Sequence, residues 1–453
     1  MLPAALLTCL VAVYNEFPLT YPDSGGYIDN ARDLAAFRAP GFFYRPFTYG
    51  VFLVPFVTRY TIWFVPLAQG LLVAAIVDLA LRAASVFLST RAFVALFAAL
   101  SVFSTLSWFS GQLMPDIFTG LVILLFFVIV YGAEPPKRRE RWLAGAVLAF
   151  AIATHLSHVA LYSALLVVAL VARVPFGGQT PSRRRLMHAT VPLLAAALLL
   201  ITPNYLLYRE PVLSRSSGLF YLAHLVNDGL AQRFLDRACP THHYQLCDDR
   251  ARLRANTDWF LWAEDGPWRR HEPETFLRES RAIIAGTLRQ ELPAVVGLSL
   301  KAAATQLVTL GAHRAEHKFS RSMYAGAQRL RLRTAYLASR QVQGTLPLEV
   351  VSIVQYAGVA VGLVLLLVSL PRLRGRAHRP LRLLIATACA GIVLNALVVT
   401  SLALVVNRYQ RRVVWLIPLL GIVAVVQAFA PRRAGAGEAM PPEPARAAPG
   451  RVS

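Results

Sequence analysis

Residues 2–27 read LPAALLTCLVAVYNEFPLTYPDSGGY, and within this stretch an apolar segment ends and a cluster of carboxylates begins. Leu2 to Val13 carries no charge, and Asp23 then stands between Pro22 and a serine followed by two glycines. Proline and glycine break helices, so the Asp23 side chain is expected on an irregular turn. A carboxylate at mid-bilayer costs roughly 2.5–3.5 kcal/mol, which places Asp23 at the water boundary or beside a polar cavity. Two roles fit it there: a helix cap, or the head of an active site that faces out of the membrane.

The composition of the 453 residues predicts an all-α polytopic membrane protein. Hydrophobic residues make up 56% of the chain and charged residues 15%, against about 25% charged residues in soluble domains. Apolar runs of about twenty residues, the length of a membrane-spanning helix, recur along the sequence. The first run lacks a basic n-region and an A-x-A cleavage site, so it is expected to stay as a span.

The net charge of +22 suggests a nucleic-acid partner, but its distribution argues against one. Many Lys and Arg residues lie in short loops between apolar runs, as in Lys137–Arg139, Arg183–Arg185 and Arg372–Arg379. This is the pattern that the positive-inside rule gives to cytoplasmic loops. The sequence has no zinc-finger, helix-turn-helix or RNP motif, so membrane lipids are expected as partners and nucleic acid is not.

The apolar runs predict about ten transmembrane helices, with both chain ends in the cytoplasm. An N-terminal transmembrane core covers 1–209 and includes a first outer loop at 21–61. A helical extracytoplasmic domain at 210–346, C-terminal spans at 347–430 and a disordered cytoplasmic tail at 431–453 follow. The spans are expected near 1–20, 62–86, 91–109, 116–133, 142–156, 159–175, 189–208, 347–370, 382–406 and 412–430.

Two features of the outer domain leave alternatives open. The segment Leu292–Gly311 is apolar enough to span, but a span there would move the Arg372–Arg379 loop outside, so it is expected outside the bilayer or at its surface. Cys239 and Cys247 flank a polar stretch, and outside the cytoplasm a disulfide is expected between them. The alternative is a metal site that combines the two thiols with His242 and His243.

Polar residues at the outer ends of the predicted spans converge on one layer. Asp23 and Arg45 lie in the first outer loop, Asp116 lies in the next, and Asn407–Arg412 is a basic segment between the last two spans. Basic residues on the outer side run against the positive-inside rule. Pairing with acids or lipid headgroups explains them, and so does binding of a phosphate. Asp116 has a second role open to it, as the cap of the helix that follows Pro115.

The residue types in this layer suggest a reaction. Asp23 and Asp116 would supply a general base or hold a divalent metal ion, and Arg408 with its neighbours would neutralise a phosphate. Displacing a phosphate from a sugar carbon needs a base on the attacking side and positive charge on the leaving side. His155 and His158 stand between two spans, where polar packing in a tight turn or a shared metal ion would explain them.

The first outer loop carries Asp23, then Tyr27, an Ala-Arg-Asp segment at 31–33, and Arg45-Pro46-x-x-Tyr49. In this arrangement it resembles the GT-C superfamily of glycosyltransferases, which includes protein O-mannosyltransferases and the aminoarabinose transferase of lipid A. The resemblance covers roughly residues 1–210, together with the 400–420 region. Many members have paired acids in this loop, whereas here Asp29 and Asp33 are the nearby substitutes for a second acid.

The resemblance implies a catalytic acid at Asp23, a second acid at Asp116 and contacts from a polyprenyl phosphate to Arg408 or Arg411. Arg45 is a further candidate for the phosphate. The single acid at Asp23 leaves the need for a divalent metal ion open. Residues expected to contact the substrate are Tyr27, Tyr49, His155, His158 and Tyr409.

The sequence therefore predicts an integral-membrane enzyme of the bacterial inner membrane with its active site facing the periplasm. It would move a sugar from a polyprenyl-phosphate carrier to an extracytoplasmic acceptor, either a glycan, a lipid or a protein, with inversion. Tryptophans of the outer domain would select the acceptor. One alternative is an enzyme like an O-antigen ligase or polymerase, which would use Arg233, His242 and His313. Another is a lipid transporter or flippase, which would use acids within spans such as Asp78.

Overall fold

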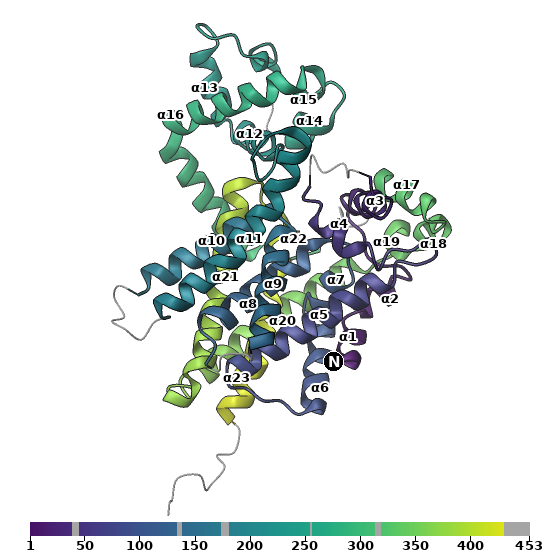
Figure 1. The fold of residues 1–453 in the computed structure, drawn as a ribbon, viewed down its shortest axis with the longest axis vertical. Helices are drawn as coiled ribbons and strands as arrows, with labels where there is room; N and C mark the ends of the chain where they lie inside the picture. Colours follow the sequence, from purple (N-terminus) through teal and green to yellow (C-terminus); the bar gives the residue numbers. More distant parts are fainter. Residues whose placement is uncertain (39–44, 134–137, 174–180, 254–255, 313–318, 430–453) are drawn as a thin grey trace, which may run out of the picture.

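The computed structural model of the chain is built of helices and describes residues 1–38, 45–133, 138–173, 181–253, 256–312 and 319–429. Figure 1 shows most of the helices in one elongated bundle, with a smaller helical lobe at one end. Within the described ranges no β-strand forms, and the β structure there is an isolated bridge between Leu19 and Gln112. The all-helical fold class is therefore confirmed for this part of the chain. The predicted tail at 431–453 lies outside it.

Five helical segments of the described chain are long and apolar enough to cross a membrane, which indicates an integral membrane protein. Shorter apolar helices accompany them, so about ten spans stay a prediction. The five segments are α5 (Phe64–Ala83), α11 (Arg183–Tyr208), α20 (Leu348–Ser369), Arg376–Leu402 with α21 (Arg379–Leu402), and Asn407–Phe429 with α22 (Asn407–Val414) and α23 (Leu416–Phe429).

The remaining α-helices fall into two groups along the chain. Those before α11 are α1 (Leu2–Leu7), α2 (Leu10–Tyr14), α3 (Ser24–Ala35), α4 (Thr48–Leu53), α6 (Thr90–Phe103), α7 (Leu106–Ser110), α8 (Phe118–Val130), α9 (Arg138–Ala153) and α10 (Leu156–Val171). Those after it are α12 (Ser217–Asn227), α13 (Leu230–Ala238), α14 (Thr257–Trp262), α15 (Pro267–Arg270), α16 (Pro273–Val308), α17 (Arg321–Arg329), α18 (Arg333–Ala338) and α19 (Arg340–Gln343).

The segment at 1–20, predicted as one span, forms the two short helices α1 and α2 instead. The helix is interrupted at Thr8, whose hydroxyl turns back to donate to the carbonyl of Ala5 at 2.7 Å. At this point α1 lies very close to α5, because a Cβ added to Gly70 of α5 would stand 2.3 Å from Thr8 Oγ1. The interruption therefore coincides with a close helix contact that the apolar pattern of the segment does not reveal.

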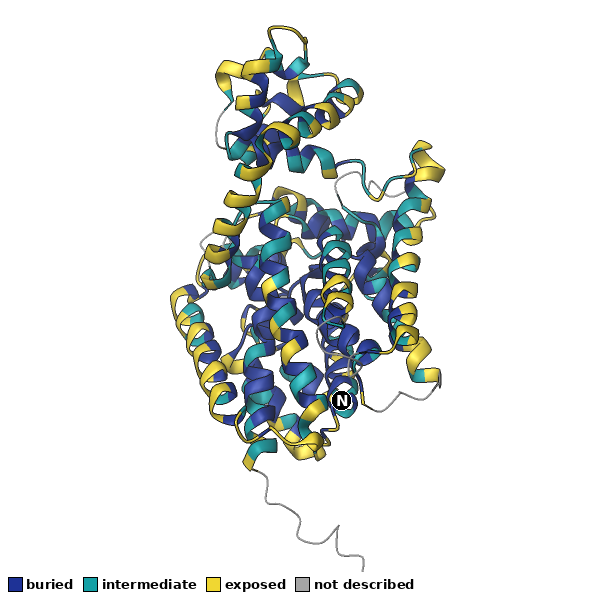
Figure 2. Ribbon diagram, turned by 90° about the vertical axis from the view of Figure 1, so that its left-hand side faces the viewer, coloured by how far each residue is buried: buried dark blue, intermediate teal, exposed yellow. Residues whose placement is uncertain are grey.

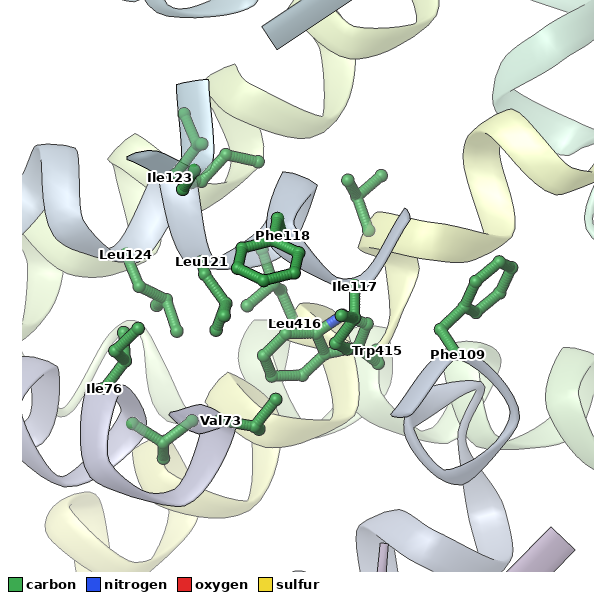
Figure 3. Packing of buried hydrophobic residues seen from close by; sticks show 14 of the residues in the cluster. Val73, Ile76, Phe109, Ile117, Phe118, Leu121, Ile123, Leu124, Trp415 and Leu416 are labelled. Atoms are coloured by element: carbon green, nitrogen blue, oxygen red, sulfur yellow. The ribbon is translucent and has the colours of Figure 1, made fainter. Parts of the chain in front are cut away.

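The core of the bundle is organised around α8, in which every residue except Ile129 is buried. A helix that is apolar on all sides needs neighbours on all sides, and α8 packs against α5, α9, α10, α11 and α21. Figure 3 shows Phe118 of α8 clustered with Val73 of α5 and with Trp415, which joins α22 to α23. Figure 2 shows the resulting division of the bundle into a buried interior and an exposed exterior.

The lobe consists of α12–α15 and the first part of α16, and it has a hydrophobic core of its own. Phe234 and Phe260 belong to this second core, which Figure 2 shows as a separate buried region. The expected disulfide between Cys239 and Cys247 is present in the lobe. Neither thiol is therefore left for the alternative metal site with the two histidines between them.

The predicted extracytoplasmic domain at 210–346 divides into two parts. The helix α16 has a non-helical residue at Glu291, two positions before Pro293, and its second half packs along α21. This half, the ambiguous apolar segment of the sequence, is followed by Leu310, whose N–H donates to the Tyr356 hydroxyl of α20 at 3.0 Å. It is not among the five membrane-crossing candidates. Beyond it, α17 packs on α3, α18 packs on α17 and α19 packs on α18, and we name α17–α19 the cover of α3.

Glycines line the contact between α20 and α23. A Cβ added to Gly362 of α20 would lie 2.8 Å from the Cα atom of Pro418. One added to Gly421 of α23 would lie 2.6 Å from the carbonyl oxygen of Gly362. Small residues of this kind let helix backbones approach closely in membranes.

Gly362→Ala is expected to destabilise the protein by about 1–3 kcal/mol, because the added methyl group overpacks this contact. The loss outweighs the gain of about 1 kcal/mol that alanine brings to a helix interior. Gly145→Ala on α9 is the matched control, since a Cβ there meets nothing within 4 Å. Thermal unfolding in detergent should show a lower midpoint for Gly362→Ala alone, and a midpoint as high as that of the control would contradict the close contact.

Candidate active site at Asp23 and Asp116

A short backbone pairing brings Asp23 and Asp116 to the same place. The chain around Leu19 lies parallel to the chain around Gln112, with a backbone N–H···O bond of 2.9 Å on each side of the bridge. Asp23 stands four positions after Leu19, and Asp116 stands four positions after Gln112. Because parallel segments leave a pairing at the same end, the two acids emerge side by side.

The free edge of this pairing is closed by Gln341 from the cover of α3. The Gln341 amide N–H donates to the Thr20 carbonyl at 2.7 Å, and its oxygen accepts from the Thr20 N–H at 2.9 Å. The backbone N–H of Gln341 donates to the Asn15 side chain at 2.7 Å, and the Ser320 hydroxyl donates to the Pro22 carbonyl at 3.3 Å. Side chains from a distant part of the sequence therefore hold the segment that leads to Asp23.

Asp23 lies on a turn before α3, as expected, but the two glycines after it lie inside the helix and do not break it. The helix α3 begins at Ser24 and includes Gly25 and Gly26. A Cβ added to Gly25 would lie 2.3 Å from the backbone of Ser322 in α17, so only glycine fits under the cover of α3. Asp23 occupies the N-cap position, but its side chain makes no capping hydrogen bond. Its carboxylate is therefore directed to other partners.

Those partners are arginines, and together they form the acid–arginine cluster of Asp23, Asp116, Arg45, Arg408 and Arg412. Asp23 accepts a hydrogen bond from Arg45. Arg408 Nη1 lies between the two acids, 3.6 Å from Asp23 Oδ2 and 3.9 Å from Asp116 Oδ2. Arg412 Nη1 lies 3.2 Å from Asp116 Oδ1. Three guanidiniums and two carboxylates leave the cluster with a net positive charge.

Arg408 and Arg412 differ in how far their hydrogen-bonding groups are satisfied. Arg412 donates to Asp116, to the Ser157 hydroxyl at 3.0 Å and to the Asn395 side chain at 3.0 Å. Its Nε has no hydrogen-bond partner, whereas both Nε and Nη1 of Arg408 are buried without one, as is the Oδ2 atom of Asp116. The Arg408 guanidinium is held instead by the Tyr21 ring, 4.0 Å away. Buried donors are normally satisfied, so Arg408 has capacity for an anionic ligand.

The structure separates Arg411 from the cluster, which corrects its expected role at the phosphate. Its Nε donates to the Gln355 side chain of α20 at 3.1 Å, and its guanidinium lies 4.9 Å from the Trp108 ring. Arg412 takes the place beside Arg408 that was predicted for Arg411. Arg411 stands three positions after Arg408 and Arg412 stands four, and both spacings put side chains on one helix face, so the sequence does not distinguish them.

The two histidines differ in their partners, and His155 is linked to the cluster through Ser157, which accepts a hydrogen bond from Arg412. His155 caps α10, where its Nδ1 accepts from the Ser157 N–H at 3.2 Å. His158 is completely buried, and its ring nitrogens lie 2.8 Å from Thr119 Oγ1 and 2.8 Å from the Ala151 carbonyl. The expected polar packing is thus what the structure shows for His158, with no ring nitrogen left for a substrate.

Two of the tyrosines expected at the substrate are packing residues. Tyr27 and Tyr49 are buried with their rings edge to face, 5.0 Å apart, and the Tyr49 hydroxyl donates to Gln69 at 2.8 Å. Tyr409 does lie at the cluster, with its ring 5.2 Å from both Arg408 and Arg412. The exposure of a side chain cannot be read from a loop sequence, and a tyrosine that directly follows a glycine pair gives no sign of being buried.

The other acids of the first loop have partners outside the cluster. Asp29 pairs with Arg329 of α17 at 2.8 Å, and Asp33 pairs with Arg38 at 2.8 Å. Burial raises the pKa of the Asp29 carboxyl, although its neighbouring arginines favour the charged form. Burial also raises the pKa of Tyr27, and the nearby carboxylate of Asp23 adds to this shift, so the phenol stays protonated at neutral pH.

The acid–arginine cluster does not fit the divalent metal ion that was left open for Asp23 and Asp116. Arg408 already lies between the two carboxylates, and Arg45 and Arg412 contact their other oxygens. A divalent cation would add to an existing net positive charge. In the part of the chain that the structure describes, no three His, Cys, Asp or Glu side chains come together as a metal site. We therefore assign no metal-dependent step to the cluster.

Gln341→Leu is expected to destabilise the protein by about 1–3 kcal/mol for each backbone group of Thr20 that is left buried without a partner. The matched control is Gln328→Leu, at an exposed position of the same cover. Thermal unfolding midpoints in detergent compare the two variants. Similar midpoints would show that Gln341 does not hold the segment before Asp23.

Asp116→Leu is expected to cost about 3–5 kcal/mol of stability, because it leaves Arg412 buried without its counter-charge. Asp78→Leu is the control: Asp78 pairs with Arg82 at 2.9 Å, but both side chains are partly exposed. Such a pair contributes about 0–1 kcal/mol. Denaturant unfolding in mixed micelles measures both losses, and an equal loss for the two variants would contradict the buried pair.

Comparison of the chain with protein-family models, with curated proteins and with solved structures finds no match. The similarity of the first loop to the GT-C superfamily stays an expectation from a few residues. What the site does therefore has to follow from the chemistry of the acid–arginine cluster.

Proposed function

We propose that the protein is a membrane glycosyltransferase of the GT-C type, which moves a sugar from a polyprenyl-phosphate carrier to an acceptor with inversion. The observation that supports this is a carboxylate, Asp23, beside a guanidinium, Arg408, whose Nε and Nη1 have no hydrogen-bond partner. Transfer from a lipid phosphate needs this pair: a base for the acceptor hydroxyl and a cation for the departing phosphate.

In the proposed reaction Asp23 takes the proton of the acceptor hydroxyl while the hydroxyl oxygen attacks the sugar carbon. The bond from that carbon to the phosphate oxygen breaks, and its electron pair leaves with the phosphate. Arg408 neutralises the departing charge through its unused N–H groups. Asp116 is a positioning residue in this scheme, because it contacts Arg408 and Arg412 and holds them beside the reacting atoms.

The place of the cluster in the bundle supports a site on the side of the membrane away from the arginine-rich loops. The helix α11 begins with Arg183 and ends with Tyr208, and Arg45 shares a pocket with Leu200 and Asn204 near that second end. Arginine-rich loops face the cytoplasm under the positive-inside rule. In a bacterial inner membrane the cluster would then face the periplasm.

Arg233 and Asp78, on which the two alternative functions rely, each have an ion-pair partner. The ligase-type alternative relies on Arg233, which pairs with Glu291 at 3.5 Å, and on histidines such as His313, which lies outside the described residues. The transporter alternative relies on an acid within a span. Asp78 of α5 pairs with Arg82 one turn further along the same helix. Of the described residues in these two alternatives, Arg233 and Asp78 are each engaged in an ion pair.

Asp23→Asn is expected to lower the rate of sugar transfer by about 100-fold or more, because the amide cannot accept the hydroxyl proton. The rate is measured with purified protein in lipid and a polyprenyl-phosphate sugar donor. Asp33→Asn is the matched control, since Asp33 is 31% exposed like Asp23 and also pairs with an arginine, but lies outside the cluster. It should keep the wild-type rate.

Transfer that survives Asp23→Asn in folded protein would rule out Asp23 as the base. A wild-type protein that transfers no sugar from any polyprenyl-phosphate donor would contradict the proposed function itself. Thermal unfolding of each variant separates a lost reaction from a lost fold.

A further inference from the structure

Arg45 contacts Asp23 and also lines a pocket beside the acid–arginine cluster. The pocket is a shallow depression, and the empty space of about 250 Å³ over it includes open solvent. Its lining combines a cation, an amide and a hydroxyl with apolar side chains, a combination that suits an amphipathic ligand with an anionic group. The polar lining comes from Arg45, Asn204 and Ser214, and the apolar lining includes Phe47, Leu200 and Leu213.

The pocket opens beside a helix that is suited to contact with lipid. Leu200 and Asn204 of α11 are buried where they line it, whereas Leu198 and Leu206 on the same helix are 64% and 61% exposed. The helix α11 is one of the five membrane-crossing candidates. Its exposed leucines would contact acyl chains, so a lipid can reach the pocket from within the bilayer.

We propose that this pocket binds the headgroup of the sugar acceptor, and that the acceptor is an anionic lipid with a free hydroxyl. The proposal rests on the proposed glycosyltransferase function. One oxygen of Asp23 contacts Arg45, and the other lies 3.6 Å from Arg408. The base therefore has a cation on each side: Arg408 for the donor phosphate and Arg45 for the anionic group of the acceptor. This moves Arg45 from the donor side, where the sequence placed it, to the acceptor side.

Arg45 is also the arginine of the cluster with room to change partner. Its side chain is 27% exposed, against 10% for Arg408 and 0% for Arg412. Gly26 leaves the space that Arg45 occupies, since a Cβ there would lie 2.7 Å from Arg45 Nη1. An anionic headgroup in the pocket competes with Asp23 for Arg45. Acceptor binding thus frees the Asp23 carboxylate when the acceptor hydroxyl arrives.

Binding of dioctanoyl-phosphatidylglycerol tests the pocket without any transfer reaction, because this probe has a phosphate, free hydroxyls and short chains. Isothermal titration to the purified full chain in detergent gives the affinity. Arg45→Gln should weaken binding about tenfold or more through the loss of charge-assisted hydrogen bonds. Arg38→Gln, whose arginine pairs with Asp33 at 2.8 Å, should bind like the wild type. Asp23→Asn should bind more tightly, since Arg45 loses its competitor.

Equal affinities of the wild type and Arg45→Gln, or weaker binding by Asp23→Asn, would overturn the proposal. Glycerol phosphate, which has the headgroup without the chains, should bind at least about tenfold more weakly than the lipid. Equal binding of the two would show a site for a soluble anion and overturn the lipid assignment. Dioctanoyl-phosphatidylcholine, whose headgroup is zwitterionic and has no hydroxyl, should bind more weakly than phosphatidylglycerol, and equal binding would also overturn it.

The titration tests the acceptor pocket and the transfer assay tests the glycosyltransferase function, so either proposal can be disproved without the other measurement. A protein that binds the probe through Arg45 and transfers no sugar would disprove the glycosyltransferase function and the acceptor role, and would leave a lipid site of another kind. A protein that transfers sugar and binds the probe without Arg45 would keep the function and disprove the acceptor pocket.

Discussion

The backbone pairing of Leu19 with Gln112 is the constraint on which the site depends. In a helical chain it aligns two segments in parallel, so that the acids that follow them emerge together. Backbone groups in such a short pairing would exchange their partners with water if an edge were open. Gln341 closes that edge by bonding both backbone groups of Thr20. The position of Arg408 between two carboxylates is a consequence of this alignment.

The acid–arginine cluster costs free energy, because it buries charged side chains in a largely apolar protein. Removing charges from water costs more than an ion pair returns unless every group is well satisfied, and apolar residues of similar size often do as well. The two terminal nitrogens of Arg412 donate to Asp116, Ser157 and Asn395, and its Nε alone has no hydrogen-bond partner. Arg408 is less well satisfied, because two of its nitrogen atoms have no hydrogen-bond partner. In the proposed function, the departing phosphate would supply the missing partners of Arg408.

Local patterns in the sequence were enough to find much of this site. The acids Asp23 and Asp116, with Arg408 and Arg45, stand where apolar runs end, and the structure brings them into one cluster. The choice between Arg411 and Arg412 was beyond reach, because adjacent helix positions differ by about 100° and the sequence does not orient the helix. Burial of tyrosines in the first loop and the contribution of Gln341 depend on segments that meet only in the folded chain. Such contacts leave no local pattern to read.

The cover of α3 also has a consequence for biosynthesis. Thr20 and Gln341 stand 321 positions apart in the chain, and at roughly 5–20 residues per second the ribosome needs roughly 16–64 s to make that stretch. Asp23 and Arg45 are only 22 positions apart, so both are synthesised early in translation. Arg408 and Arg412 emerge after Gln341, near the end of translation. A product truncated before residue 408 would carry Asp23, Asp116 and Arg45 without Arg408 and Arg412, so the complete acid–arginine cluster cannot form in it.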